Sequence, residues 1–457
     1  MGLVVFVLLT GLEIALAIYS CTKGKEKKAQ RKCRLIVRAA EVVPAVIALL
    51  LSPGQKWRFV PALVFLLILL VIAAFRMLIM RDRGAGAKKP VGAIVSCVLC
   101  VLFYGLLLVP AFLFTGYNGL PVSGEYEIGE ASAILIDKSR TDPYEQDGSF
   151  REVPVHFYYP LTEESSVERF PVVVFSHGAF GYYQSNTSTY TELASNGYVV
   201  VALDHPHHAL FTEDTAGKTV IVDMDFINTA MNLNDTVEPQ TQYELYTQWM
   251  ALRTADMGFV LDALERAVQD NAMDDSWFLT DSDSDTVLSV LHMCDISKIG
   301  LMGHSMGGAA SVALGRERDD LSAVIDIDGT MLSEYTGVAD GKLTVSEEPY
   351  DVPVLEFVNW ENYNDLAEYL EAYRAEGGRY PNDELMRHAA VGFTTTIRDT
   401  RHMDFTDLPL LSPALGNMLG SGERDKAETM TIVNSLVLQF FDCYLKGEGV
   451  FTVQDSY

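Results

Sequence analysis

A serine flanked by glycines, between an apolar strand and a helix, is the feature that most limits how this chain can fold. The pentapeptide is Gly303-His304-Ser305-Met306-Gly307, with the apolar residues 299–302 before it and the helix-forming residues 308–314 after it. Glycines allow the close backbone approach that so sharp a turn requires, and the turn projects the serine hydroxyl above the sheet. The pattern predicts a strand–turn–helix unit, a nucleophile elbow, in which Ser305 is a candidate nucleophile.

Short apolar runs on both sides of this unit complete a predicted sheet. Residues 170–176 and 198–203 are continuous runs rich in valine, which suit strands that are covered on both faces. Further strands are predicted at 298–302, 323–327, 354–358 and 393–397, with helices at 188–196 and 243–269. Alternating strands and helices, together with the serine turn, predict an α/β-hydrolase fold with a doubly wound, mostly parallel sheet.

Two polar stretches interrupt this pattern. Residues 205–240 are long and irregular, and they form a candidate cap or binding loop. Residues 281–285, Asp-Ser-Asp-Ser-Asp, resemble the start of a calcium loop but are not followed by the glycine and glutamate that such a loop needs. We therefore expect a solvated loop at 281–285.

A serine hydroxyl becomes a good nucleophile only beside a general base, and in this fold the chain order is Ser, Asp, His. Two histidines follow Ser305: His388 within a predicted helix, and His402 in the loop after the strand at 393–397. A loop that leaves the end of a strand can reach the serine, so His402 is the candidate base.

The acid is expected where the strand after the serine helix ends, within Val324-Ile325-Asp326-Ile327-Asp328-Gly329. Asp326 and Asp328 share one face of this strand by alternation, so both are candidates. Asp328 is preferred because it stands at the strand end, before the turn-forming Gly329, where it can reach a loop histidine.

Acyl transfer also needs two backbone N–H groups for the developing oxyanion. Met306, directly after the serine, is one candidate donor, and Ala179, in the loop after the strand at 170–176, is the other. His177 in that loop is expected to be a structural hydrogen-bonding residue. The segment Asp204-His205-Pro206-His207-His208 could bind a metal, but we expect it to line the pocket, and no metal or cofactor is predicted.

Charge is distributed unevenly along the chain. The 457 residues carry a net charge of −27, yet residues 1–117 hold 15 Lys+Arg and 4 Asp+Glu, which leaves 19 and 57 for residues 118–457. An acidic body lacks the basic face that phosphates require, so nucleic acid is not an expected partner. The sequence predicts a transmembrane region at 1–117 and a catalytic domain at 118–457.

Four apolar stretches make up the predicted transmembrane region. They are residues 1–20, 35–51, 59–80 and 91–116. A helix of about 20 residues crosses a bilayer, and 91–116 does so without a single charge. Residues 1–20 are expected to be retained, because a signal peptide has its basic residues before the apolar run and here they follow it. Residues 35–51 are the weakest span, with two charges and a proline inside.

Two basic loops, 23–34 and 81–89, determine the predicted orientation, because Lys and Arg stay on the cytoplasmic side. The result is a multi-pass cell-membrane protein whose catalytic domain lies on the extracytoplasmic side. Cys294 and Cys443 of that domain could form a disulfide, although free thiols are the preferred interpretation since a large domain does not need a cross-link.

Several blocks resemble the platelet-activating-factor acetylhydrolases of the plasma and isoform II type. They are VVVFSHGAFG at 172–181, LASNGYVVVALDH at 193–205, DISKIGLMGHSMGG at 295–308, Ile-Asp-Gly at 327–329 and the His-x-x-Phe-x-Asp pattern at 402–407. The resemblance spans about 150–445, and it departs from the family at Met306, where phenylalanine is frequent, in the 205–240 loop and in the added N-terminal region. It implies a calcium-independent serine esterase that removes short or oxidised acyl chains from phospholipids, with Asp328 as the acid.

Other functions fit the same residues. A GHSMGG turn also occurs in cutinase-like polyesterases, so a cutinase- or lipase-like carboxylesterase or a thioesterase is an alternative, as is an inactive hydrolase-fold envelope or receptor protein. The expected partners are a small-molecule or lipid ester and the bilayer, with no prediction of oligomeric state. The acidic body favours a diffusing or zwitterionic ester over an anionic lipid.

Overall fold

The computed structural model describes residues 1–457 apart from 23–26, 53–54, 80–89, 115, 163–167, 234–235, 362, 364–370, 372 and 376. The chain forms two compact units. The first consists of Met1–Asn118 and Leu410–Gly416, and the second of Gly119–Pro409 and Asn417–Tyr457.

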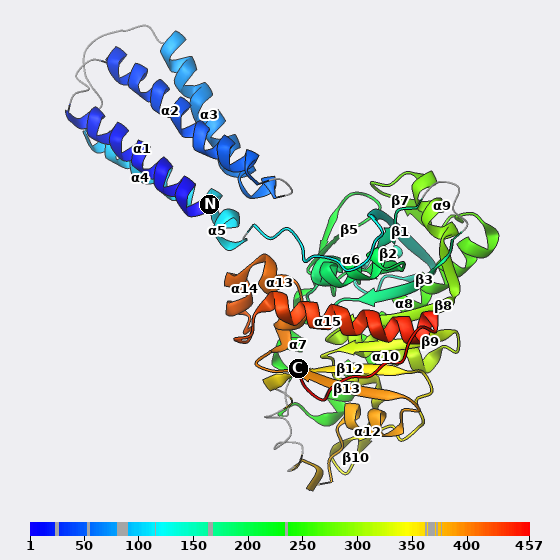
Figure 1. The fold of residues 1–457 in the computed structure, drawn as a ribbon. Coiled ribbons are helices and arrows are strands. Elements are labelled where there is room, and N and C mark those ends of the chain that lie inside the picture. The colour runs from blue at the N-terminus through cyan, green and yellow to red at the C-terminus, as the bar shows by residue number, and fades with distance from the viewer. Residues whose placement is uncertain are drawn as a thin grey trace. The chain divides into compact units, whose positions relative to one another are not determined.

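The first unit contains a bundle of helices (Figure 1). They are α1 Gly2–Thr22, α2 Lys27–Leu50, α3 Val60–Ile79, α4 Pro90–Leu107 and α5 Val109–Leu113, with a 3-10 turn, η1, at Lys56–Arg58. Helix α1 packs against α2 and α4, and α2 packs against α3. The small apolar core between them includes Leu9, Phe59, Leu66 and Tyr104.

Two of the described helices, α1 and α3, are long and apolar enough to cross a membrane, where the sequence predicted four spans. Helix α2 carries many basic residues in its first half, and the apolar part of α4 is short. The predicted span 91–116 divides into α4 and α5, because Pro110 lacks the N–H that would continue the helix. The predicted orientation rests on basic loops of which residues 23–26 and 81–89 lie outside the described residues.

The second unit is built around a nine-stranded mixed sheet in the order β13-β12-β9-β8-β3-β4-β2-β1-β7 (Figure 1). The strands are β1 Ile128–Thr141, β2 Phe150–Pro160, β3 Phe170–Ser176, β4 Val199–Leu203, β7 Trp277–Leu279, β8 Cys294–His304, β9 Leu321–Ile327, β12 Val354–Asn359 and β13 Gly392–Ile397. The six strands from β13 to β4 are parallel, and β2, β1 and β7 are joined to them in antiparallel pairs. The sequence predicted the parallel strands but not this antiparallel edge.

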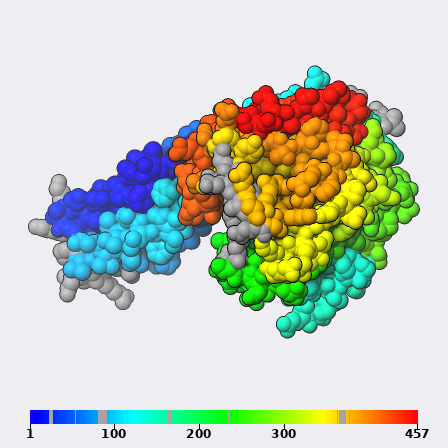
Figure 2. Space-filling model, turned by 90° about the horizontal axis from the view of Figure 1, so that it is seen from below, coloured from blue at the N-terminus to red at the C-terminus, as the bar shows by residue number. Residues whose placement is uncertain are grey.

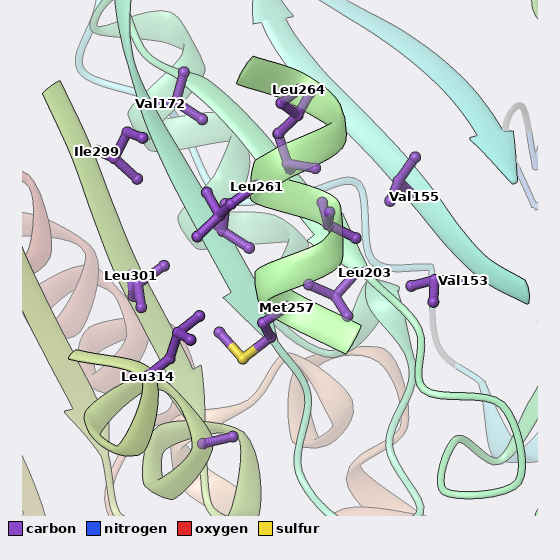
Figure 3. Close-up of a cluster of buried hydrophobic side chains, with 14 of the residues drawn as sticks. Val153, Val155, Val172, Leu203, Met257, Leu261, Leu264, Ile299, Leu301 and Leu314 are labelled. Carbon is purple, nitrogen blue, oxygen red and sulfur yellow. The ribbon is translucent and has the colours of Figure 1, made fainter. Parts of the chain in front are cut away.

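Helices cover both faces of the sheet. In β3 every residue is buried, and successive side chains enter opposite cores, Val174 on one side and Val173 on the other. The first core joins the sheet to α8 Pro239–Asp270, α9 Ser284–His292 and α10 Met306–Glu317. Figure 3 shows side chains of α8 and α10 beside those of the strands in this core. The second core joins the sheet to α6 Thr187–Ser195 and α15 Lys426–Phe441, and Figure 2 shows the outer surface of α15 in red. Because full burial of such a side chain contributes about 1.5–3 kcal/mol, these two cores fix the strands that position the site.

The remaining elements are short. They are β5 Phe211–Glu213, β6 Thr219–Ile221, α7 Met224–Asn232, β10 Tyr335–Ala339, β11 Lys342–Val345, α12 Pro381–His388, α13 Leu408–Leu411, α14 Pro413–Met418, and the turns η2 Tyr183–Asn186, η3 Leu332–Glu334, η4 His402–Phe405 and η5 Asp442–Lys446. The stretch 205–240 thus holds the hairpin β5–β6 and helix α7 instead of an irregular loop.

The second unit tests two local predictions, one for residues 281–285 and one for the two cysteines. The stretch 281–285 is not simply a loop, because the side chain of Asp283 accepts from Thr286 N–H and caps α9. Cys294 and Cys443 are both free thiols, so no disulfide joins them.

Candidate active site

Ser305 occupies the sharp turn between β8 and α10. Its φ is 55° and its ψ is −126°, and its N–H donates to Ile327 O at 2.8 Å. A non-glycine residue at positive φ stores roughly 1–3 kcal/mol of strain that its surroundings must hold. The turn presents a partly exposed serine at the N-terminus of a helix, where negative charge is favoured.

The glycines around Ser305 leave no room for a side chain. A Cβ at Gly303 would lie 2.2 Å from the carbonyl carbon of Gly307. A Cβ at Gly307 would lie 1.9 Å from Ser176 O, at the end of β3. Helix α10 therefore packs directly on β8 and β3, and this contact supports the strained serine from below.

His402 and Asp328 approach each other from two strands. Asp328 follows β9 with a φ of 60°, and His402 begins η4 after β13. His402 Nδ1 lies 2.5 Å from Asp328 Oδ2. The Asp328 carboxylate also accepts from Asn359, from the backbone N–H at 2.7 Å and from the side-chain amide at 2.9 and 3.1 Å. The carboxylate is thus fixed by several donors and directs the Nδ1 side of the imidazole toward itself.

Sequence reasoning missed Asn359. The available signal was its position at the end of β12, the strand that lies between the acid-bearing β9 and the base-bearing β13.

His304 connects the histidine to the serine turn. The rings of His304 and His402 lie 4.6 Å apart between centroids, and His304 Nε2 donates to His402 O at 3.2 Å. Within the described residues no hydrogen bond joins His402 to Ser305 Oγ. Catalytic hydrogen bonds of this kind often tighten only when substrate binds.

The charge state of His402 depends on Asp328. Burial acts to lower the pKa of His402, but the hydrogen bond to Asp328 and its negative charge outweigh burial and raise the pKa above its ordinary value. The imidazolium form is therefore stabilised, as a proton acceptor in this position requires.

Asp326 belongs to the core beneath the turn. It is fully buried, and its Oδ1 accepts from Gly329 N–H at 2.9 Å. Burial, together with the Glu356 and Asp328 carboxylates, raises the pKa of Asp326 well above its ordinary value. Strand alternation predicts that Asp326 and Asp328 lie on one face of β9. The prediction fails because Asp328 lies beyond the end of β9, at positive φ. The structure brings Asp328, and not Asp326, to His402.

The loop after β3 lies against the serine turn. A Cβ at Gly178 would lie 3.2 Å from Ser305 Cβ. Within the described residues, the N–H groups of Ala179 and Met306 have no backbone or side-chain acceptor. Both groups therefore remain free to donate to a ligand.

The histidines of the 205–208 segment contact other protein groups. His205 lies between Asp256 and Ser176, and His208 Nε2 lies 2.8 Å from the Tyr144 hydroxyl. Among the residues that the structure describes, no group of three or more His, Cys, Asp or Glu side chains could hold a metal ion.

Comparison with known protein families agrees with the resemblance of the sequence blocks. The model of the family "Platelet-activating factor acetylhydrolase, isoform II" matches residues 148–455. The chain belongs to this family. The matched residues include Ser305, Asp328 and His402.

Individual relatives of this acetylhydrolase family member extend the comparison. A platelet-activating factor acetylhydrolase of Gallus gallus is 25% identical over 312 residues, covering 63% of this chain and 65% of the chicken protein. Cutinase est1 of Thermobifida alba is 38% identical over 89 residues, covering 17% of this chain and 28% of the cutinase. The solved structure of a ferulic acid esterase from Streptomyces cinnamoneus matches with a TM-score of 0.51 and 22% identity, over 72% of this chain and 93% of the esterase. At that identity the structural match shows the fold alone, which is α/β-hydrolase-like.

Proposed function

We propose that the second unit is a serine esterase that cleaves carboxylic esters through an acyl-enzyme. The observation that carries the proposal is the contact of His402 with Asp328, 2.5 Å long, beside a serine held at a φ of 55°. In this proposal Ser305 is the nucleophile, His402 the general base and Asp328 the acid that orients it. Membership of the acetylhydrolase family supports the same assignment.

The proposed reaction has two halves. His402 Nε2 takes the proton of Ser305 Oγ as this oxygen attacks the ester carbonyl carbon, and the N–H groups of Met306 and Ala179 donate to the oxyanion. His402 then gives the proton to the leaving alcohol oxygen, and the acyl group remains on Ser305. Water attacks the acyl-enzyme with His402 again as base, which releases the acid and restores the serine.

We infer that the substrates are phospholipid-like esters with short or modified acyl chains. The family match and the chicken relative, a platelet-activating factor acetylhydrolase, support this class. The local similarity to a cutinase favours a second candidate, a cutinase- or lipase-like carboxylesterase. Hydrolysis rates over a series of acyl lengths and headgroups separate the two, because only the first predicts a preference for short acyl chains on a glycerophospholipid.

A fluorophosphonate probe tests whether the serine is reactive. We expect the purified protein to be labelled on the peptide that contains Ser305, and the Ser305→Ala variant to remain unlabelled. Absence of label on folded wild-type protein would support the inactive-receptor alternative, and equal labelling of the variant would place the nucleophile elsewhere.

We also propose that the first unit anchors the protein in a membrane, with the second unit on the extracytoplasmic side. Arg38 is buried and contacts Glu13, Glu41 at 2.5 Å and the Tyr104 hydroxyl at 2.9 Å. The exposed residues include many large apolar side chains of α1, α3 and α4. A water-soluble bundle buries its apolar side chains and exposes its charged ones, whereas this bundle buries charges and exposes apolar side chains. The arrangement suits a lipid environment.

Protease added to intact cells tests this topology. Digestion of the second unit is expected, and full protection in intact cells with digestion after lysis would contradict the extracytoplasmic placement.

A further inference from the structure

Beneath the loop that carries Ala179 lies a buried arginine, Arg253 of α8. Its exposure is 0%. Its Nη1 donates to His177 O, and its Nη2 lies 3.4 Å from Gly178 O. Its Nε lies 3.4 Å from His208 Nδ1. Within the described residues no carboxylate lies within ion-pair distance of Arg253, so the guanidinium donates to backbone carbonyls of the loop, with the Asp256 carboxylate favouring its charge from further away.

The Gly178 carbonyl and the Ala179 N–H belong to one trans peptide, so they point in opposite directions. Three donors bind Gly178 O: His177 Nδ1 at 2.6 Å, Gly181 N–H at 3.1 Å and Arg253 Nη2 at 3.4 Å. Because these donors fix the carbonyl on one side, the Ala179 N–H faces the other side. Hydrogen bonds to a carbonyl also polarise its peptide and strengthen the N–H as a donor.

The tautomer of His177 is fixed by its second partner. His177 Nε2 accepts from His205 N–H at 3.2 Å, which leaves Nδ1 as the protonated nitrogen that donates to Gly178 O. Burial above all, and then the charge of Arg253, lower the pKa of His177 to about 3. The ring is therefore neutral, and it acts as a single fixed donor to the loop.

A buried side-chain relay holds Arg253 in turn. Ser176 Oγ lies 3.4 Å from Arg253 Nη1 and 2.9 Å from His205 Nε2. His205 Nδ1 lies 3.0 Å from Asp256 Oδ2, and Arg151 Nη2 lies 2.8 Å from the same oxygen. This serine–histidine–aspartate chain has the connectivity of a catalytic triad, but all three of its residues have 0% exposure. It cannot meet substrate, so its role is to fix the base of the loop.

We propose that Arg253 is a positioning residue of the oxyanion hole. It holds and polarises the Gly178–Ala179 peptide, so that Ala179 N–H meets the negatively charged oxygen of the tetrahedral intermediate. This inference rests on the proposed esterase activity of Ser305. Arg253 does not touch the reacting atoms and acts only through the loop.

The test compares Arg253→Gln and Arg253→Lys with a matched control, Arg266→Gln. Arg266 lies on the same helix, and its Nε lies 3.4 Å from Asp274 Oδ2 at the exposed surface, away from the relay and the loop. Two readouts are measured on each purified variant. The first is kcat and KM for p-nitrophenyl acetate. The second is the inhibition constant of a trifluoromethyl ketone, whose adduct with Ser305 places an oxyanion in the hole.

We expect Arg253→Gln to lower kcat about 10- to 100-fold, less than the roughly 100- to 1,000-fold loss caused by removing an oxyanion donor outright. KM should stay within about threefold, since the interaction is made in the transition state. The affinity for the trifluoromethyl ketone should fall by the same factor as kcat. Arg266→Gln should leave both readouts within about twofold of wild type.

A folded Arg253→Gln variant with wild-type kcat would overturn the proposal. A loss of kcat without a matching loss of inhibitor affinity would also overturn it. Positioning of the oxyanion hole lowers both quantities together, whereas a purely structural role need not weaken binding of the oxyanion adduct. If thermal unfolding shows that Arg253→Gln does not fold, the same two readouts on Arg253→Lys decide whether the proposal holds. Lysine keeps the positive charge but has a single nitrogen in place of the two that contact His177 O and Gly178 O. An inactive wild-type protein, or full activity in Ser305→Ala, would instead contradict the proposed function.

Discussion

His402 Nδ1 lies 2.5 Å from Asp328 Oδ2, although 74 positions separate the two residues in the chain. The sheet accounts for the contact, because β9 precedes Asp328, β13 precedes His402, and only β12 lies between these strands. Asn359, at the end of β12, donates to the same carboxylate. Acid, supporting amide and base thus lie at the C-terminal ends of three adjacent parallel strands.

The first prediction concerns the acid. Asp328→Asn should lower kcat for p-nitrophenyl acetate by about a thousandfold to ten-thousandfold, because the amide no longer stabilises the imidazolium of His402. Asp326→Asn should change kcat by less than about tenfold, since Asp326 is buried beneath the turn and does not contact His402, and since burial already disfavours its charged form. A large loss only in the Asp326 variant would show that the wrong aspartate has been chosen.

The pH dependence follows from the raised pKa of His402. The base must be neutral, so kcat/KM should rise with pH through a pKa above the ordinary value of 6.5. Because Asp328 raises this pKa, the same limb should shift to lower pH in the residual activity of Asp328→Asn. Profiles of kcat/KM recorded from about pH 5 to 9 measure the rising limb of the wild type and that of the variant. If the limb of the variant is not shifted, a group other than His402 is responsible for it.

The same pKa shift has a consequence for stability. A histidine whose pKa is raised by folding stabilises the folded state below its unfolded pKa, and this contribution is lost as pH rises through the folded pKa. The difference in unfolding free energy between wild type and His402→Ala should therefore shrink as pH rises through that range. Urea unfolding at several pH values measures it, and a difference that grows with pH would contradict the assigned direction.

Asn359 should matter for the acid without touching substrate. Asn359→Leu removes two side-chain hydrogen bonds to the Asp328 carboxylate, and hydrogen bonds to charged groups contribute about 1.5–3 kcal/mol. We expect a lower free energy of unfolding of that order and a reduced kcat. The exposed Asn228→Leu on α7 is the matched control, and equal effects in both variants would remove the special role of Asn359.

Replacement of glycine by alanine should change the free energy of unfolding in opposite directions at the elbow and in α8. Gly307→Ala places a Cβ 1.9 Å from Ser176 O, so it should lower the unfolding free energy by about 1–3 kcal/mol or more and reduce activity. Gly258→Ala lies within α8 with its nearest neighbour, Leu314, 3.8 Å away, and should stabilise the protein by about 0.5–1 kcal/mol. Chemical denaturation of both variants tests the tight packing of α10 on β3.

The parallel strands could be predicted from sequence because burial on both faces leaves an uninterrupted apolar run, as in β3, whose predicted and observed bounds agree. The antiparallel strands β1 and β2 could not, since their polar and apolar residues mix. They pair with each other across a short connection, but their other partners, β7 and β4, lie further along the chain. The positive φ that turns Asp328 out of β9 has no pattern in the sequence, so the choice of Asp328 rests on its place at the strand end and on the family resemblance. The role of Arg253 could not be predicted, because in the sequence it is one of several polar residues inside a helix. Only the tertiary fold places it beneath the loop of Gly178.

The central claim is that Ser305 is the nucleophile of an esterase, and the hydrolysis of p-nitrophenyl acetate by purified Ser305→Ala tests it most directly. The wild-type protein should hydrolyse the ester, and the variant should be folded and show no detectable turnover. Turnover by the variant at the wild-type rate would contradict the account.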